Sequence, residues 1–165
     1  MSRMGFRITQ TMASLNIISY NSTGLGGTKV KLINDLLTDC APQVLMLQET
    51  WLLPNDTQRL LSIHPDYLGS GISSVSNDEV PRGRPYGGLG FLWNKSIAAN
   101  VRAIKTSSDR VYALRIKLQD YTALLINVYF PVDRKNVTEV SPPFEECLQT
   151  IESLISDEKC DFFIT

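Results

Sequence analysis

Histidine and cysteine are scarce in this sequence. Of its 165 residues, one is histidine and three are cysteine. Cys40, Cys147 and Cys160 are odd in number and lack metal-ligand spacing, which argues against a disulfide framework or a cysteine-bound zinc and indicates reduced thiols in an intracellular compartment, nuclear or cytoplasmic. His64 precedes Pro65 at the expected end of a helix, so we interpret it as a helix-end residue and not as a catalytic base.

Long apolar runs and an excess of charge of one sign are also missing. No apolar run approaches the ~18–20 residues needed to cross a bilayer, so we expect no membrane association. Sixteen Lys and Arg against seventeen Asp and Glu give a net charge of −1, so any contact with nucleic acid would be a local contact with phosphate. Motifs of the P-loop, G-x-G-x-x-G and G-x-S-x-G types are absent. A composition of 43% hydrophobic and 20% charged residues indicates one globular domain.

The first half of the sequence alternates between strand and helix patterns. Leu15–Tyr20 and Gln43–Gln48 are short apolar runs that predict strands. Apolar residues recur at helical spacing over Thr28–Cys40, and Pro54–Ile63 opens with a proline typical of a helix start. The following segment, Gly69–Pro85, is rich in Gly, Ser, Asn and Asp and predicts a surface loop. The beginning of the chain is therefore expected to be β-α-β-α.

The second half is expected to consist mainly of strands. Four segments rich in Val, Ile, Tyr and Leu are separated by polar turns and predict a meander: Gly87–Trp93, Ala98–Lys105, Arg110–Leu118 and Tyr121–Phe130. Pro143–Ser156 then shows helical spacing, and Cys160–Ile164 begins another buried strand. The pattern as a whole predicts an α/β domain.

Glu49 is the most informative residue. It stands at the polar end of the apolar run Val44–Leu47, which predicts a strand buried on both faces. An acid at the end of such a strand is held rigidly at the mouth of a sheet, where ligand sites are usually built. Glu49 is therefore a candidate metal ligand, although a solvated acid at a strand end would show the same pattern.

Four phrases occur in order along the chain: Ser19–Leu25, Leu47–Trp51, Gly87–Phe91 and Ile126–Pro131. Together they resemble the endonuclease/exonuclease/phosphatase superfamily, and most closely the apurinic-endonuclease-like domain of non-LTR retrotransposon polyproteins. The resemblance covers residues 13–165 and leaves residues 1–12 as an N-terminal extension. It implies a four-layer α/β sandwich, in which two packed β-sheets are flanked by helices, and a domain that is truncated at its C-terminus.

The resemblance also implies a function and roles for particular residues. The function is Mg²⁺-dependent hydrolysis of a DNA phosphodiester, a nick that primes reverse transcription in a retroelement. By position in the matching phrases, Glu49 would bind the metal, Asn21 would hold the metal site and the phosphate, and Tyr129 would contact the phosphate. Arg82 and Arg84, in the expected loop, could clamp a phosphate or be solvated. From residue type alone, Asn21 also suits a turn and Tyr129 a core position.

Three neighbouring features qualify this expectation. Asn127 is expected to be buried support, and Gly87 and Gly88 to be structural. Val132 and Asp133 follow the Tyr-x-Pro phrase, where many relatives have Asn. The later Gly-Asp-x-Asn and Asp-His elements of the superfamily, which manage proton transfer, have no counterpart, so we expect weak or no nuclease activity from these residues alone. Two alternatives stay open: a degenerate, non-catalytic binding module, and a phosphatase of the same superfamily.

Overall fold

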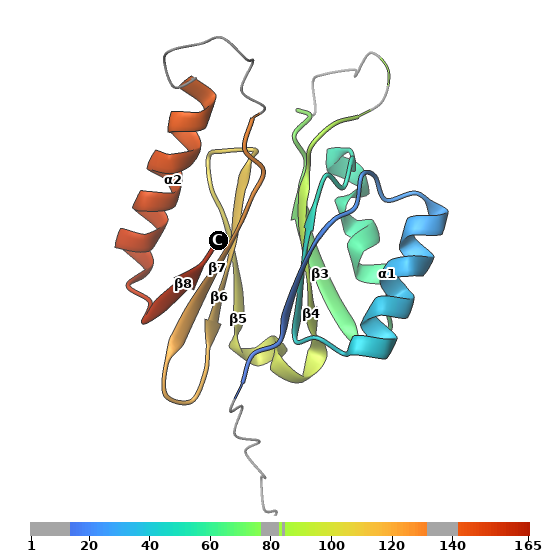
Figure 1. Ribbon diagram of the computed structural model, residues 1–165, viewed down its shortest axis with the longest axis horizontal. Coiled ribbons are helices and arrows are strands. Elements are labelled where there is room, and N and C mark those ends of the chain that lie inside the picture. Colours follow the sequence, from blue (N-terminus) through green and yellow to red (C-terminus); the bar gives the residue numbers. More distant parts are fainter. Residues whose placement is uncertain (1–13, 77–82, 84, 132–141) are drawn as a thin grey trace, which may run out of the picture.

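The computed structural model describes residues 14–76, 83, 85–131 and 142–165 (Figure 1). In chain order the elements are β1 (Ile17–Asn21), α1 (Gly27–Cys40), β2 (Val44–Gln48), the 3-10 helix η1 (Pro54–Ser62), β3 (Tyr67–Ile72), β4 (Leu89–Asn94), the 3-10 helix η2 (Lys95–Asn100), β5 (Val101–Lys105), β6 (Val111–Lys117), β7 (Thr122–Val128), α2 (Pro142–Glu158) and β8 (Phe162–Ile164). Over these residues, the strands form two four-stranded sheets that face each other.

The first sheet has the strand order β1-β2-β4-β3. β1 and β2 are parallel and are connected through α1, as expected for a crossover that passes over one face of a sheet. β4 lies antiparallel between β2 and β3. The parallel pairing brings the C-terminal ends of β1 and β2 to the same edge of this sheet, with Asn21 opposite Gln48.

The second sheet has the order β5-β6-β7-β8. β5, β6 and β7 form an antiparallel meander, and α2 connects β7 to the parallel strand β8. β8 is one edge strand, and Phe162, Phe163 and Ile164 are 40–51% exposed, so the prediction that Cys160–Ile164 begins a buried strand is wrong.

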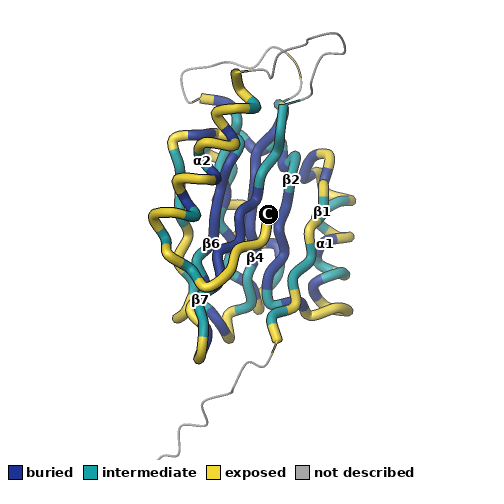
Figure 2. The backbone as a smooth tube through the Cα atoms, turned by 60° about the vertical axis from the view of Figure 1, so that its left-hand side comes forward, coloured by how far each residue is buried: buried dark blue, intermediate teal, exposed yellow. Residues whose placement is uncertain are grey.

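Helices cover the outer face of each sheet, so the molecule has four layers (Figures 1 and 2). α1 and η1 pack on the first sheet through a cluster that includes Ile33, Leu37 and Leu60, and α2 packs on the second sheet through Cys147 and Ile151. Between the sheets lies a third cluster of fully or almost fully buried residues: Val44, Met46, Leu89, Phe91, Ile97, Tyr112, Leu114, Ile116, Leu118 and Leu125. The predicted four-layer α/β sandwich is confirmed.

Three other predicted elements are wrong in detail. The first strand of the expected meander, β4, belongs to the other sheet, because its side chains are buried against η1 on one face and against the second sheet on the other. The expected loop at Gly69–Pro85 begins with β3, and only the part from Ser73 onward lies outside a strand among its described residues. Also, Lys95–Asn100 is a 3-10 helix, so β5 starts later than predicted.

The glycines of β3 explain why its pattern resembles a loop. A side chain at Gly69 would place its Cβ 2.7 Å from the backbone oxygen of Leu60 in η1. A Cβ at Gly71 would lie 2.7 Å from a side-chain carbon of Leu60. Glycine at both positions lets η1 lie directly on the strand, a close approach that removes the apolar alternation by which strands are recognised.

Within the described ranges, no helix is both long and apolar enough to cross a membrane.

Candidate phosphate and metal site

The side chains of Asn21 and Glu49 are in direct contact at the C-terminal edge of β1 and β2. Nδ2 of Asn21 donates a hydrogen bond of 2.7 Å to Oε1 of Glu49, and Oδ1 of Asn21 accepts one of 3.0 Å from the backbone N–H of Thr23. The Asn21 amide is therefore fixed at both ends, and its donor faces the carboxylate.

The backbone at Glu49 is held in an unusual conformation. Its φ of 52° lies in the left-handed region, which costs a residue other than glycine about 1–3 kcal/mol. Its carbonyl accepts hydrogen bonds from the backbone N–H of Gly24, at 2.7 Å, and from Oγ of Ser22, at 3.0 Å. These bonds offset the strain and turn the carboxylate out of the line of β2.

Gly87 and Gly88 support the same turn from the other side. The carbonyl of Gly88 accepts from the N–H of Thr50 at 3.1 Å, and the carbonyl of Gly87 accepts from the N–H of Trp51 at 3.0 Å. Gly88 has a φ of 81°, and a Cβ there would lie 2.6 Å from Oγ1 of Thr50. The structural role expected of these glycines therefore has a physical basis.

Tyr129 and Glu49 line a common pocket of about 410 Å³, together with Trp51, Pro85, Tyr86, Gly87, Arg110 and Pro131. Tyr129 follows β7, and its N–H donates to the carbonyl of Arg110 at 3.1 Å. The three side chains that were expected to share a site, Asn21, Glu49 and Tyr129, thus lie within one cluster, joined through Glu49.

Burial and a neighbouring carboxylate shift the pKa of Tyr129 upward. Burial raises the pKa of Tyr129 above its usual value near 10, and the hydrogen-bonded, negatively charged Glu49 raises it further. Arg110 acts in the opposite direction and lowers that pKa. At neutral pH the phenol is therefore a hydrogen-bond donor, placed beside one carboxylate and one guanidinium.

Asn127 lies behind the pocket and is completely buried. Its Nδ2 donates to the carbonyls of Leu47 and Gly90 at 2.9 and 3.0 Å, and its Oδ1 accepts from Nε2 of Gln48 at 2.7 Å. The Asn127 side chain, on β7, therefore connects the second sheet to β2 and β4. Its partners on β2, Leu47 and Gln48, immediately precede Glu49 in the chain. The expectation that Asn127 is buried support agrees with these contacts.

Two of the predicted phosphate contacts lie outside the described residues. Arg82 and Arg84 both fall in those gaps, so their role stays a prediction. Arg110 is a cation that the sequence reasoning missed. Its position follows from the register of the β6–β7 hairpin, in which Val111 pairs with Val128, so that Arg110 lies beside Tyr129.

The donor set fits a hard divalent cation held in part by substrate. Mg²⁺ binds through one or two carboxylates, water and phosphate oxygens, and a carboxylate has lone pairs for more than one partner. Glu49 can therefore accept from Asn21 and still ligate a cation. The Asn21 oxygen already accepts from Thr23, which favours a supporting role over direct ligation. Across the described ranges, no group of three or more His, Cys, Asp or Glu residues could hold a metal without substrate.

His64 takes no part in this cluster. Its Nε2 lies 3.3 Å from Oγ1 of Thr38, its Nδ1 accepts from the N–H of Asp66 at 3.1 Å, and its ring contacts Tyr67 edge-on. These contacts agree with the helix-end role expected for this residue.

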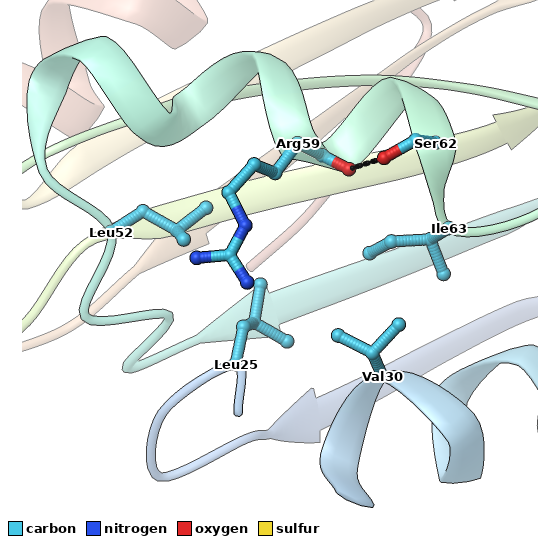
Figure 3. A pocket seen from close by; sticks show the side chains of 6 residues that line it. All are labelled: Leu25, Val30, Leu52, Arg59, Ser62 and Ile63. Carbon is cyan, nitrogen blue, oxygen red and sulfur yellow. Dashed lines mark hydrogen bonds between the residues drawn. The ribbon is translucent and has the colours of Figure 1, made fainter. Parts of the chain in front are cut away.

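A smaller cavity of about 90 Å³ lies between α1 and η1 (Figure 3). Its lining comprises Leu25, Val30, Leu52, Arg59, Ser62 and Ile63. The side chains of Val30 and Ile63 point toward each other across it, and Oγ of Ser62 donates to the carbonyl of Arg59 at 2.9 Å. Its wall combines apolar side chains with the exposed residues Arg59 and Ser62, and it shares no residue with the pocket at Glu49.

Comparison with known proteins gives one family match. The model of the Endonuclease/Exonuclease/phosphatase family matches residues 14–157, which is most of the chain. A search among curated proteins gives no match.

Solved structures with the same fold include two endonucleases and a 3' phosphatase. The endonuclease domain of TRAS1, a telomere-specific non-LTR retrotransposon, has a TM-score of 0.56 at 11% identity and covers 87% of this chain and 54% of its own. The 3' phosphatase NExo from Neisseria, bound to a product DNA hairpin, has a TM-score of 0.56 at 18% identity, with 88% and 53% covered. The AP endonuclease of Leishmania major has a TM-score of 0.54 at 17% identity, with 71% and 40% covered. This chain spans about half the length of these structures.

Proposed function

Because the chain belongs to the endonuclease/exonuclease/phosphatase family, we propose that it carries the metal- and phosphate-binding part of a DNA phosphodiesterase site. The retroelement endonuclease expected from the sequence is the preferred form of this activity, supported by the shared fold of the TRAS1 domain. The observation that carries the proposal is the contact between Asn21 and Glu49 in a pocket that Tyr129 and Arg110 also line.

Each of these side chains has a role in the proposed site. Glu49, oriented by Asn21, would hold Mg²⁺, which would supply positive charge against the developing charge on the phosphate. Tyr129, kept protonated by its surroundings, would donate a hydrogen bond to a phosphate oxygen. Arg110 would pair with another oxygen of the same phosphate.

The same pocket supports binding better than it supports turnover. Its lining includes no imidazole, and Glu49 is its single carboxylate among the described residues. A group that transfers a proton contributes about 10² to 10⁴ in rate. We therefore propose that the 165 residues bind DNA phosphate with the help of Mg²⁺ and hydrolyse it slowly, and that a binding module is the second candidate function.

Metal-linked DNA binding tests this proposal. Binding of a labelled oligonucleotide is measured by fluorescence anisotropy with and without Mg²⁺, beside a plasmid-nicking assay. We expect Mg²⁺ to tighten binding by the native chain and not by Glu49→Gln. Glu152→Gln, which removes an exposed carboxylate on α2, is the matched control and should behave as the native chain does.

The two assays separate the outcomes. Slow nicking that needs Glu49 supports the phosphodiesterase, whereas Mg²⁺-dependent binding without nicking supports the binding module. Rapid nicking abolished by Glu49→Gln would contradict the slow turnover proposed here. Binding that responds to Mg²⁺ equally in both forms would contradict the role of Glu49 as the metal ligand.

A further inference from the structure

Aromatic side chains line the pocket beside Glu49. Trp51, Tyr86 and Tyr129 contribute to its wall, with Arg110 as the cation among the described lining residues. Accepting the phosphodiesterase site proposed above, we propose that Trp51 and Tyr86 stack an unpaired nucleobase next to the bound phosphate. The site would then act on single-stranded or locally splayed polynucleotide in preference to regular duplex.

Tyr86 is available for a ligand. It is 52% exposed, although large aromatic residues are usually buried, and it lines the pocket. Exposed aromatic surface next to polar binding groups is typical of recognition sites. A nucleobase suits such a surface, because every base offers an aromatic face for stacking, and stacking needs no particular hydrogen-bond pattern.

The backbone places Tyr86 beside Trp51. The carbonyl of Gly87, the residue after Tyr86, accepts from the N–H of Trp51 at 3.0 Å. The ring of Trp51 in turn lies against Gly24, since a Cβ built there would be 2.2 Å from ring atom Cε3. Both aromatics are thus carried by hydrogen-bonded or tightly packed backbone, so a base would enter a preformed site.

The size and charge of the pocket favour a single strand. Its volume of about 410 Å³ is within the roughly 300–1,000 Å³ common for ligand pockets. The net charge of the chain is −1, and Arg110 is the cation of the described pocket wall. Proteins that hold duplex DNA through its backbone often neutralise about 6–10 phosphates. Beside this one described cation, base stacking would add to the affinity, and a base inside a regular duplex is already stacked on its neighbours.

The test compares strands of equal charge that differ in their bases. The full chain is titrated into labelled oligothymidylate and into an abasic oligomer with the same number of phosphates, with Ca²⁺ in place of Mg²⁺, and a duplex serves as a third ligand. We expect oligothymidylate to bind about 5- to 100-fold more tightly than the abasic strand, the range that stacking of one base gives, with quenching of tryptophan fluorescence.

Two variants assign the effect to the aromatic pair. Tyr86→Ala should reduce the preference for bases and leave the affinity for the abasic strand unchanged. Tyr121→Ala, which removes a tyrosine that packs on Phe162 outside the pocket lining, is the control and should keep the preference. Trp51→Phe keeps a smaller ring and should give an intermediate preference.

The outcomes distinguish this inference from the proposed function. Equal affinity for oligothymidylate and the abasic strand, or an equal loss of both in Tyr86→Ala, would overturn base stacking while leaving phosphate binding intact. Absence of binding to every strand would overturn the phosphodiesterase site and the inference with it. Tighter binding of the duplex than of oligothymidylate would also overturn the preference for an unpaired base.

Discussion

The side chain of Asn127, on β7, donates a hydrogen bond of 2.9 Å to the backbone carbonyl of Leu47, on β2 of the opposite sheet. The same amide also bonds Gly90 and Gln48, so it satisfies polar groups of two strands across a mainly apolar interface. Buried polar groups of this kind stabilise a structure only when every partner is satisfied. The expected support residue is therefore also the point at which the two sheets are aligned behind Glu49.

Replacement of Asn127 should lower stability more than its size suggests. Asn127→Leu has a similar volume but leaves the carbonyls of Leu47 and Gly90 without this donor, and each unsatisfied buried group costs about 1–3 kcal/mol. We expect the free energy of unfolding to fall by about 3 kcal/mol, measured by urea denaturation. Asn55→Leu, at an exposed position, is the control and should change it little. Equal midpoints for the two variants would show that the Asn127 contacts contribute nothing.

Removal of the charge at Glu49 should lower the pKa of Tyr129. Burial raises this pKa first, and Glu49 adds to the increase, so Glu49→Gln should bring it closer to the usual value near 10 and leave the burial effect. The native phenol remains protonated to higher pH than in the unfolded chain, so its contribution to stability is present below pH ~10 and is lost as pH rises through the raised pKa.

Tyrosine labelled with ¹³C at Cζ gives the measurement. The Tyr129 resonance, assigned by comparison with Tyr129→Phe, is followed against pH in the native chain and in Glu49→Gln. An unchanged midpoint in Glu49→Gln would mean that the two side chains do not interact in solution.

Gly24→Ala should displace Trp51. Gly24 has a φ of 96°, and its added Cβ would meet the indole ring at 2.2 Å. Left-handed backbone alone costs an alanine about 1–2 kcal/mol, so the loss of stability should be at least that large. Trp51 emission and urea denaturation measure the two effects. Gly27→Ala is the control: it lies in α1 with nothing within 4 Å of its added Cβ, and it should leave stability unchanged or slightly higher.

Filling the cavity between α1 and η1 should stabilise the fold. Val30→Ile adds one methyl group toward the space of about 90 Å³, a gain of roughly 0.8 kcal/mol if the group is fully buried. Val30→Thr has the native shape but replaces a half-buried methyl group with a hydroxyl and so loses apolar burial, which should lower stability. Thermal denaturation of both variants gives the comparison, and a lower melting temperature for Val30→Ile would mean that the cavity cannot accept the added volume.

The residue pattern predicted most of the strands and both long helices, and the resemblance to the superfamily predicted the four layers. Apolar runs of the right length predicted the strands that became β1, β2, β6 and β7, and helical spacing predicted α1 and α2. The acid at the end of β2 predicted where a site would form, because parallel strands end at the same edge of a sheet. The roles assigned to Asn21, Glu49 and Tyr129 stay predictions, since the structure gives their positions and not their chemistry.

Features that depend on pairing between distant segments could not be predicted. Whether β4 joins the first or the second sheet is decided by which faces become buried, and a strand buried on both faces has no alternation to reveal it. β3 was hidden by the glycines that η1 requires. Arg110 is a pocket residue because of the register of β6 and β7, and this register cannot be read from the positions of charged residues in the sequence.

The exposed edge of β8 affects how the protein can be handled. Strand margins with free backbone groups and apolar side chains act as templates for other extended peptides. Phe162, Phe163 and Ile164 give this margin three such side chains in succession. Concentrated samples of these 165 residues are therefore expected to self-associate along this margin, and Phe163→Lys would be the simplest change to keep the molecules apart during crystallisation or spectroscopy.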